Sequence, residues 1–128
     1  MKETRGPVIL LVDADLDNRE MYTEYLRTRR YQVIPCGDGQ ECVDLARRHH
    51  PDLILLELRM DGMTGIEILA QLKAEPSLAG VPMVALTASV MPFQQRAALA
   101  AGFTRVIPKP CMPEDLADEI ATMLSVGP

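Results

Sequence analysis

Short apolar runs alternate with segments of helical periodicity along nearly the whole chain. The apolar runs have the length and the branched residues of buried strands, and they are PVILLV (7–12), YQVIP (31–35), DLILLE (52–57), VPMVALTA (81–88) and TRVIPKP (104–110). Helices are predicted between and after them, over 16–30, 39–49, 65–75 and 92–101 and from Pro113 onward. Strands that are each followed by a helix pair in parallel through right-handed crossovers, so the chain is predicted to be an α/β protein.

The alternation predicts a doubly wound fold, in which a five-stranded parallel sheet lies between two layers of helices (α/β/α). We expect residues 1–128 to form a single domain with a core over about 7–126, because 48% of the residues are apolar. The strands are apolar throughout, which is typical of a sheet covered on both faces. Helical spacing predicts that Met21 shares the buried face of the first helix with Tyr22, and that Ile66 belongs to the apolar stripe of the third helix.

Charge and composition exclude several classes of function. The formal net charge is −5 and no basic run is longer than two residues, so direct binding to nucleic acid is not expected. No apolar stretch reaches the roughly 18 residues that cross a bilayer, and no signal peptide precedes the first strand, so no membrane contact is expected. The three cysteines are scattered, which indicates reduced thiols. We therefore expect a soluble cytoplasmic domain.

Polar side chains stand at the ends of four predicted strands: Asp13 and Asp15, Glu57, Thr87 and Lys109. Open parallel sheets place their sites at the carboxyl ends of the strands, where the strand order reverses. Acids there can hold Mg²⁺, and a hydroxyl and a lysine can bind phosphoryl oxygens. Taken singly, an acid after a strand is often only a helix N-cap and a lysine only a solvated end. Four such residues at matching strand ends favour a site.

The segments ILLVDAD, DLILLELRMDGMTGIEIL, VPMVALTA and AAGFTRVIPKP stand in the order and spacing of a known family. In them the chain resembles the receiver domains of response regulators, which take phosphate from a histidine kinase in two-component signalling. The resemblance covers about residues 7–126 and implies a flavodoxin-like fold with strand order 2-1-3-4-5. It also implies a protein partner, a histidine kinase or a downstream output protein, bound through the face of the fourth helix, fifth strand and fifth helix.

The same resemblance implies roles for individual residues. Glu57 stands at the phosphoacceptor position, Lys109 would contact the phosphoryl group, and Thr87 would move toward it as the switch. The main-chain carbonyl of Arg59 would help to hold Mg²⁺ beside an acidic pocket formed by Asp13 and Asp15. The bond between Lys109 and Pro110 is expected to be cis, which suits an X–Pro bond.

Three positions depart from the family pattern. The phosphoacceptor, normally aspartate, is Glu57; the second acid after the first strand, normally a metal-binding aspartate, is Ala14; and the aromatic switch residue is Val106. Glutamate moves the carboxylate by about 1.5 Å, and a displacement of about 1 Å can cost on the order of a hundredfold in rate. Val106 has no ring to turn inward, so the usual read-out is blunted.

The departures also bear on the metal. Without a carboxylate at Ala14, a set made of Asp13, Glu57 and the carbonyl of Arg59 is predicted to bind Mg²⁺ weakly or not at all. Asp15 would replace the missing ligand only by moving in, and it is interpreted as the N-cap of the first helix. We also predict an ion pair shorter than about 4 Å between Lys109 and Glu57, because no other partner for the lysine is expected nearby.

These features favour a degenerate receiver, an interaction module rather than an enzyme, which works without phosphorylation and in which Glu57 imitates the phosphorylated state. A second interpretation is a working receiver that accepts phosphate at Glu57 or at Asp61, although Asp61 before a glycine is also typical of a turn. In a third, LLVDAD resembles the first motif of haloacid-dehalogenase-type phosphatases, with Asp13 as nucleophile and Asp15 as acid. Those enzymes need a further strand with an acidic pair for Mg²⁺, and only one helix follows Lys109.

Overall fold

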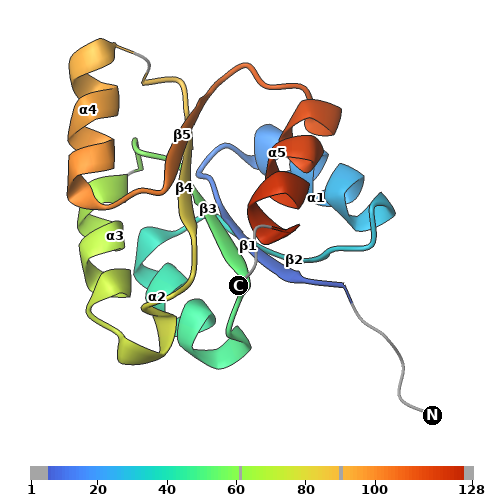
Figure 1. Cartoon of the computed structure of the whole chain (residues 1–128), viewed down its shortest axis with the longest axis horizontal. Helices are drawn as coiled ribbons and strands as arrows, with labels where there is room; N and C mark the ends of the chain where they lie inside the picture. The colour runs from blue at the N-terminus through green and yellow to red at the C-terminus, as the bar shows by residue number, and fades with distance from the viewer. Residues whose placement is uncertain (1–5, 61, 90, 126–128) are drawn as a thin grey trace.

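The computed structural model describes residues 6–60, 62–89 and 91–125 and confirms the doubly wound α/β fold (Figure 1). One parallel sheet has the order β2-β1-β3-β4-β5, as the resemblance implies. Its strands are β1 (Val8–Val12), β2 (Gln32–Cys36), β3 (Leu53–Leu56), β4 (Met83–Thr87) and β5 (Arg105–Pro108). The helices are α1 (Leu16–Thr28), α2 (Gly39–His49), α3 (Gly65–Lys73), α4 (Pro92–Ala101) and α5 (Pro113–Ser125), with a 3-10 turn, η1 (Pro76–Leu78), after α3.

The sheet separates two hydrophobic cores. Figure 1 shows α1 and α5 on one face of the sheet and α2, α3 and α4 on the other. Successive side chains of a strand point to opposite faces, so in β1 Leu11 packs into the first core and Leu10 into the second. The three central strands are buried on both faces, which explains their continuous apolar sequences.

The helices begin where the chain leaves the carboxyl ends of the strands. The side chain of Asp15 accepts a hydrogen bond from the N–H of Asn18 and caps α1, as predicted. Thr64 caps α3 in a reciprocal capping box with Glu67. These caps fix the turns that follow β1 and β3, and those turns carry the strand-end acids.

Several expectations about burial are wrong in detail. The edge strands β2 and β5 are only partly covered, because an outer strand has a neighbour on one side alone. Met21 is 42% exposed and Ile66 is 37% exposed, while Ile68 takes the core position of α3. The buried face of α1 runs through Tyr22, Thr23 and Leu26 and that of α3 through Ile68, Leu69 and Leu72, so both exposed residues lie off the buried face of their helix. Within the described residues no helix combines the length and apolar character needed to cross a bilayer.

Candidate functional site

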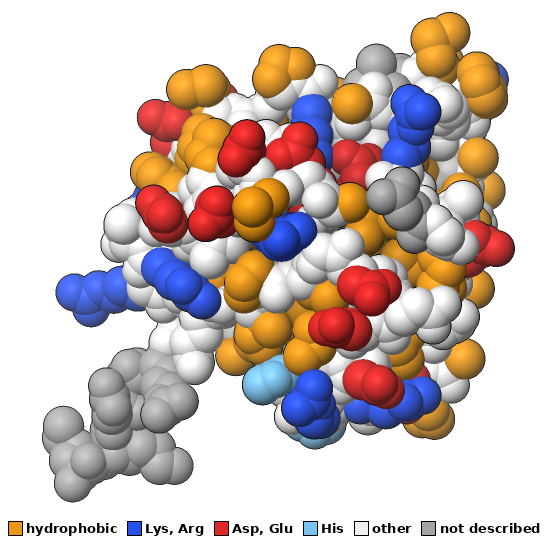
Figure 2. Space-filling model, turned by 180° about the vertical axis from the view of Figure 1, so that it is seen from behind, with side chains coloured by type: hydrophobic (Ala, Val, Ile, Leu, Met, Phe, Trp, Pro, Cys, Tyr) orange, Lys and Arg blue, Asp and Glu red, His pale blue; other side chains and the backbone are white. Residues whose placement is uncertain are grey.

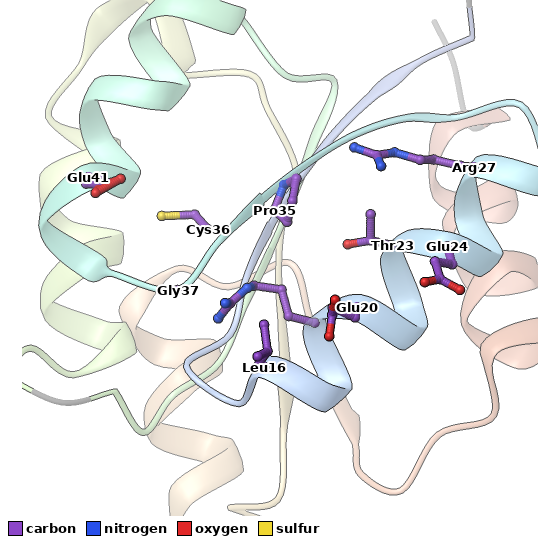
Figure 3. Close-up of a pocket in the computed structure, with 10 residues that line it drawn as sticks. Leu16, Glu20, Thr23, Glu24, Arg27, Pro35, Cys36, Gly37 and Glu41 are labelled. Atoms are coloured by element: carbon purple, nitrogen blue, oxygen red, sulfur yellow. The ribbon is translucent and has the colours of Figure 1, made fainter.

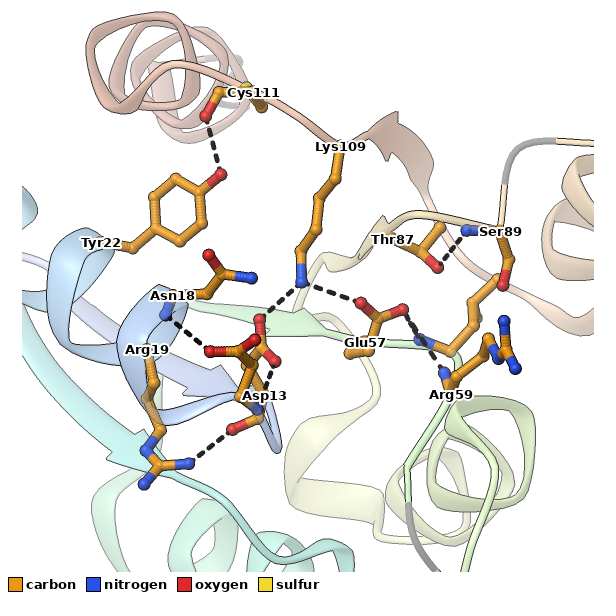
Figure 4. A network of polar contacts seen from close by, with 12 residues as sticks. Asp13, Asn18, Arg19, Tyr22, Glu57, Arg59, Thr87, Ser89, Lys109 and Cys111 are labelled. Atoms are coloured by element: carbon orange, nitrogen blue, oxygen red, sulfur yellow. Dashed lines mark hydrogen bonds and ion pairs between the residues drawn. The ribbon is translucent and has the colours of Figure 1, made fainter.

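The strand ends bring the predicted polar residues to one edge of the sheet. The register pairs Val12 with Leu56, so Asp13 and Glu57, the next residues, follow neighbouring strands. The N–H of Glu57 donates to the carbonyl of Val12 at 3.0 Å, and that of Lys109 donates to the carbonyl of Thr87 at 2.8 Å. Main-chain bonds therefore extend the sheet one residue further and hold Asp13, Glu57, Thr87 and Lys109 side by side (Figure 4).

Lys109 binds two carboxylates at once. Its Nζ lies 2.8 Å from Oε1 of Glu57, so the predicted ion pair is present. It also lies 2.6 Å from Oδ2 of Asp13, so the expectation that the lysine has no other partner is wrong. Strand β4 separates β5 from β3, and the extended lysine side chain reaches across it to the acids of the two central strands. All three side chains are largely buried, with 11% or less of each exposed.

The remaining carboxylate oxygens accept main-chain hydrogen bonds. Oε2 of Glu57 takes the N–H of Leu58 at 2.7 Å and a longer bond from the N–H of Arg59 at 3.4 Å. Oδ1 of Asp13 takes the N–H of Asp15 at 2.9 Å. Each of the four carboxylate oxygens in this cluster thus has a protein donor, which compensates for the water lost on burial.

Two opposing effects act on the pKa of Lys109. Burial disfavours the ammonium and lowers its pKa, while the hydrogen bonds and charges of Asp13 and Glu57 raise it. The acids prevail, and the pKa of Lys109 lies above its usual value of 10.5. Lys109 is therefore held as an ammonium between the two acids at neutral pH.

The arrangement fits a bound Mg²⁺ poorly. Mg²⁺ is usually held in octahedral geometry by one or two carboxylates together with water, and the two carboxylates that meet here, Asp13 and Glu57, are both bound to Lys109. Ala14 contributes no ligand, and the carboxylate of Asp15 is engaged as the cap of α1.

In the described residues, the side chains at the switch positions form no hydrogen bond with the charged cluster. Thr87 is completely buried, and its Oγ1 accepts the N–H of Ser89 at 2.9 Å. Figure 4 shows this bond on the side of Glu57 opposite Asp13. Val106 is partly buried against the core beneath α4. Arg59, whose carbonyl is the metal ligand that the resemblance implies, lies on the exposed loop after β3.

Two contacts escaped the sequence analysis. The bond between Asp13 and Lys109 is signalled only by the strand order. Because β1 lies next to β3 at the centre of the sheet, a lysine that reaches Glu57 after β3 also comes close to Asp13 after β1. Nothing in the sequence signals that Ser89 holds the hydroxyl of Thr87.

Asp61, the alternative acceptor, lies outside the described residues. The bond between Lys109 and Pro110 is cis, as the resemblance implies.

Comparison with known proteins gives a consistent result. The family model described as the response regulator receiver domain matches residues 9–121. The DNA-binding response regulator MtrA of Mycolicibacterium smegmatis is 35% identical, in an alignment that covers 98% of this chain and 58% of that protein. The chain thus spans little more than half the length of this curated relative.

Solved structures agree with the sequence comparison. The chemotaxis protein CheY4 of Vibrio cholerae is 26% identical and superposes with a TM-score of 0.87, over 91% of this chain and 98% of that one. The receiver domain of the sensor histidine kinase PA1611 from Pseudomonas aeruginosa PAO1 is 28% identical, with a TM-score of 0.85 over 93% and 98% of the chains. That structure is described with magnesium coordinated in its active-site cleft.

Proposed function

The chain belongs to the receiver domains of two-component response regulators, and we propose that it is a degenerate member, an interaction module that works without phosphorylation. In this proposal Glu57 stands at the phosphoacceptor position and keeps a negative charge against Lys109 at all times. The domain thereby imitates one signalling state rather than switching between two. It is a signalling module and not an enzyme.

The contact between Lys109 and Glu57 carries the proposal. The ammonium that a phosphoryl group would need is already bound to Oε1 of Glu57 at 2.8 Å and to Asp13 at 2.6 Å. The second oxygen of Glu57 faces the main-chain N–H groups of Leu58 and Arg59. A nucleophilic oxygen must approach a phosphoryl group in line, and both oxygens of this carboxylate are held by protein donors.

Weak magnesium binding is part of the same proposal. The PA1611 receiver holds magnesium in its cleft, and this chain retains Asp13 at the end of β1. The neighbouring position is Ala14, whose methyl group offers no oxygen. We infer that Asp13, Glu57 and the carbonyl of Arg59 hold Mg²⁺ only weakly, because Lys109 must first give up its two acids.

Partners are expected to be proteins rather than nucleic acid. A receiver communicates with a histidine kinase or an output protein, and we propose the face of α4, β5 and α5 for this contact. Phe93 and Leu99 on α4 are exposed by 60% and 50%, which leaves apolar surface for a partner. On the face that Figure 2 presents, acidic and basic side chains are interspersed and no broad basic surface appears.

Treatment with acetyl phosphate and Mg²⁺, followed by intact-mass spectrometry, tests the proposal. The expected result is no added phosphate, with amide NMR signals around Glu57 unchanged. A Glu57→Gln variant is the matched control, since it removes the carboxylate but keeps its length. Phosphate uptake by the unmodified protein that disappears in Glu57→Gln would instead establish a working receiver that uses glutamate. Uptake that persists in the control would point to a neighbouring acid such as Asp61.

A further inference from the structure

The first two turns of α1 contact the main chain on both sides of the strand-end cluster. Arg19 and Tyr22 stand three residues apart, so their side chains are neighbours on the surface of this helix. Figure 4 shows Arg19 reaching the end of β1 and Tyr22 reaching the loop that follows Lys109. Among the described residues both side chains donate to main-chain carbonyls, not to the carboxylates of the cluster. They can therefore act on the cluster through the main chain that carries it.

Arg19 holds the main chain at Asp13. Its Nη1 donates to the carbonyl of Asp13 at 2.7 Å, while the N–H of Asp13 donates to the carbonyl of Cys36 at 3.0 Å. The carboxylate of the same residue accepts the N–H of Asp15 and the ammonium of Lys109. Because both main-chain groups of Asp13 are bonded, its carboxylate leaves a fixed point and is aimed at the lysine.

Gly37 leaves the space that the guanidinium of Arg19 occupies. Figure 3 shows this glycine in the turn after β2, opposite the start of α1. A Cβ atom added at Gly37 would overlap Nη1 of Arg19 and lie 2.9 Å from its Cζ, closer than unbonded carbon atoms approach. Any side chain at position 37 would therefore push the guanidinium away from the carbonyl of Asp13.

Tyr22 holds the loop that follows Lys109. The tyrosine is 2% exposed, and its hydroxyl donates to the carbonyl of Cys111 at 2.7 Å. Cys111 comes two residues after Lys109, whose own N–H donates to the carbonyl of Thr87 at 2.8 Å. The main chain is thus held on both sides of the lysine, which fixes the point from which its ammonium reaches the two acids.

We propose that Arg19 and Tyr22 are positioning residues of the strand-end cluster, through which α1 keeps the ammonium of Lys109 bound to Asp13. One helix connects the two contacts, so α1 sets the separation between the end of β1 and the loop after β5. The proposal deepens the proposed function and rests on it, because the bound ammonium is the feature that closes the centre. A change in α1 should therefore loosen the cluster without altering any of its charged residues.

Proton exchange of the Lys109 ammonium with water, measured by ¹⁵N NMR at neutral pH, tests the proposal. An ammonium held by two buried acids exchanges slowly, and Lys109→Met identifies its signal among those of the other lysines. Arg19→Met and Tyr22→Phe each remove one hydrogen bond, and each should speed this exchange by about tenfold. Unchanged exchange in both variants would overturn the proposal whatever their effect on Tm. A wild-type ammonium that already exchanges fast would overturn it as well.

Matched variants separate positioning from folding. Arg27 makes the same kind of bond near the other end of α1, where its Nη2 donates to the carbonyl of Val33 at 2.9 Å (Figure 3). Arg27→Met should lower Tm about as much as Arg19→Met but leave the exchange of Lys109 unchanged. Tyr25→Phe is the control for the loss of a tyrosine hydroxyl, because it removes one from the exposed side of the same helix. Equal acceleration in Arg27→Met and Arg19→Met would show a purely structural effect and refute the proposal.

Gly37→Ala tests the same contact from the other side. The added methyl group displaces the guanidinium, so the exchange of the Lys109 ammonium should rise as it does in Arg19→Met. In the Arg19→Met background the guanidinium is gone, so Gly37→Ala should add little, and the two effects should be strongly non-additive. Additive effects would mean that the two residues act separately and would contradict the assigned contact. No phosphate donor is present, so the result is independent of whether acetyl phosphate modifies the protein.

Discussion

Lys109 and Glu57 are joined by a 2.8 Å contact although 52 residues separate them in the chain. The same ammonium binds Asp13 at 2.6 Å, so one side chain connects the ends of β1, β3 and β5. A carboxylate that is one methylene longer than aspartate reaches the lysine without help from a phosphoryl group. The receiver fold is thus retained, and in our proposal this ion pair closes its reactive centre.

Removing the ammonium should destabilise the domain strongly. In Lys109→Met the carboxylates of Asp13 and Glu57, both largely buried, lose their shared positive partner and repel each other. Breaking a buried pair in this way costs about 3–5 kcal/mol, and urea unfolding measures the loss. Arg48→Met at an exposed site serves as control and should change the free energy of unfolding by less than about 0.5 kcal/mol. A small loss in Lys109→Met would mean that water replaces the ammonium.

The contribution of Lys109 should vanish at alkaline pH. Its pKa is raised in the folded state, because the bonds to Asp13 and Glu57 outweigh the effect of burial. A raised lysine pKa stabilises the fold fully below the unfolded value of 10.5, and the contribution is lost as pH rises through the folded pKa. The free energies of unfolding of the wild type and Lys109→Met, measured in urea, should therefore converge once the pH exceeds the folded pKa of Lys109. A gap that stays constant would show that the pair does not titrate as described.

Cys42 should be inert toward thiol reagents in the folded protein. Burial raises the pKa of its thiol to about 12, and the side chain is fully enclosed. Cys111 is only partly buried and should react first with iodoacetamide. Peptide mapping after timed alkylation distinguishes the two, and Cys42 should be modified only at the rate of unfolding. Early modification of Cys42 would reveal local opening between α2 and the sheet.

The sequence predicts the architecture well because strand burial and helix capping leave short, repeated patterns in it. Buried strands such as 53–56 are apolar throughout, and caps such as Asp15 mark the helix starts. The carboxyl ends of parallel strands meet at one edge of the sheet, so the sequence also predicts which residues lie together there. The second partner of Lys109 and the bond from Ser89 to Thr87 depend on side-chain reach across strands, which no periodicity encodes.

Magnesium should bind weakly to the wild-type protein. A cation must take Asp13 and Glu57 from Lys109, and Ala14 supplies no replacement charge. Calorimetric or NMR titration should show no saturation at low millimolar concentrations. Sub-millimolar affinity would contradict this and would imply that Asp15 leaves its capping position to serve as a ligand.

Phosphorylation should be recoverable by two substitutions together. Glu57→Asp shortens the acceptor and frees it from Lys109, but leaves the metal weakly held. Ala14→Asp restores a metal ligand, but leaves the longer carboxylate misplaced. Both defects act on one transition state, so each single variant should gain little and the double variant much more than their sum.

Mass spectrometry of the four proteins after treatment with an acyl or amidophosphate donor and Mg²⁺ measures this coupling. Val106 still lacks an aromatic ring in the double variant, so restored phosphorylation need not restore a change at the face of α4, β5 and α5. If the wild type takes up phosphate as readily as the double variant, Glu57 is a competent acceptor and the closed ion pair must open on its own. If only the double variant does so, the length of residue 57 and the missing acid at position 14 together account for the lost reaction.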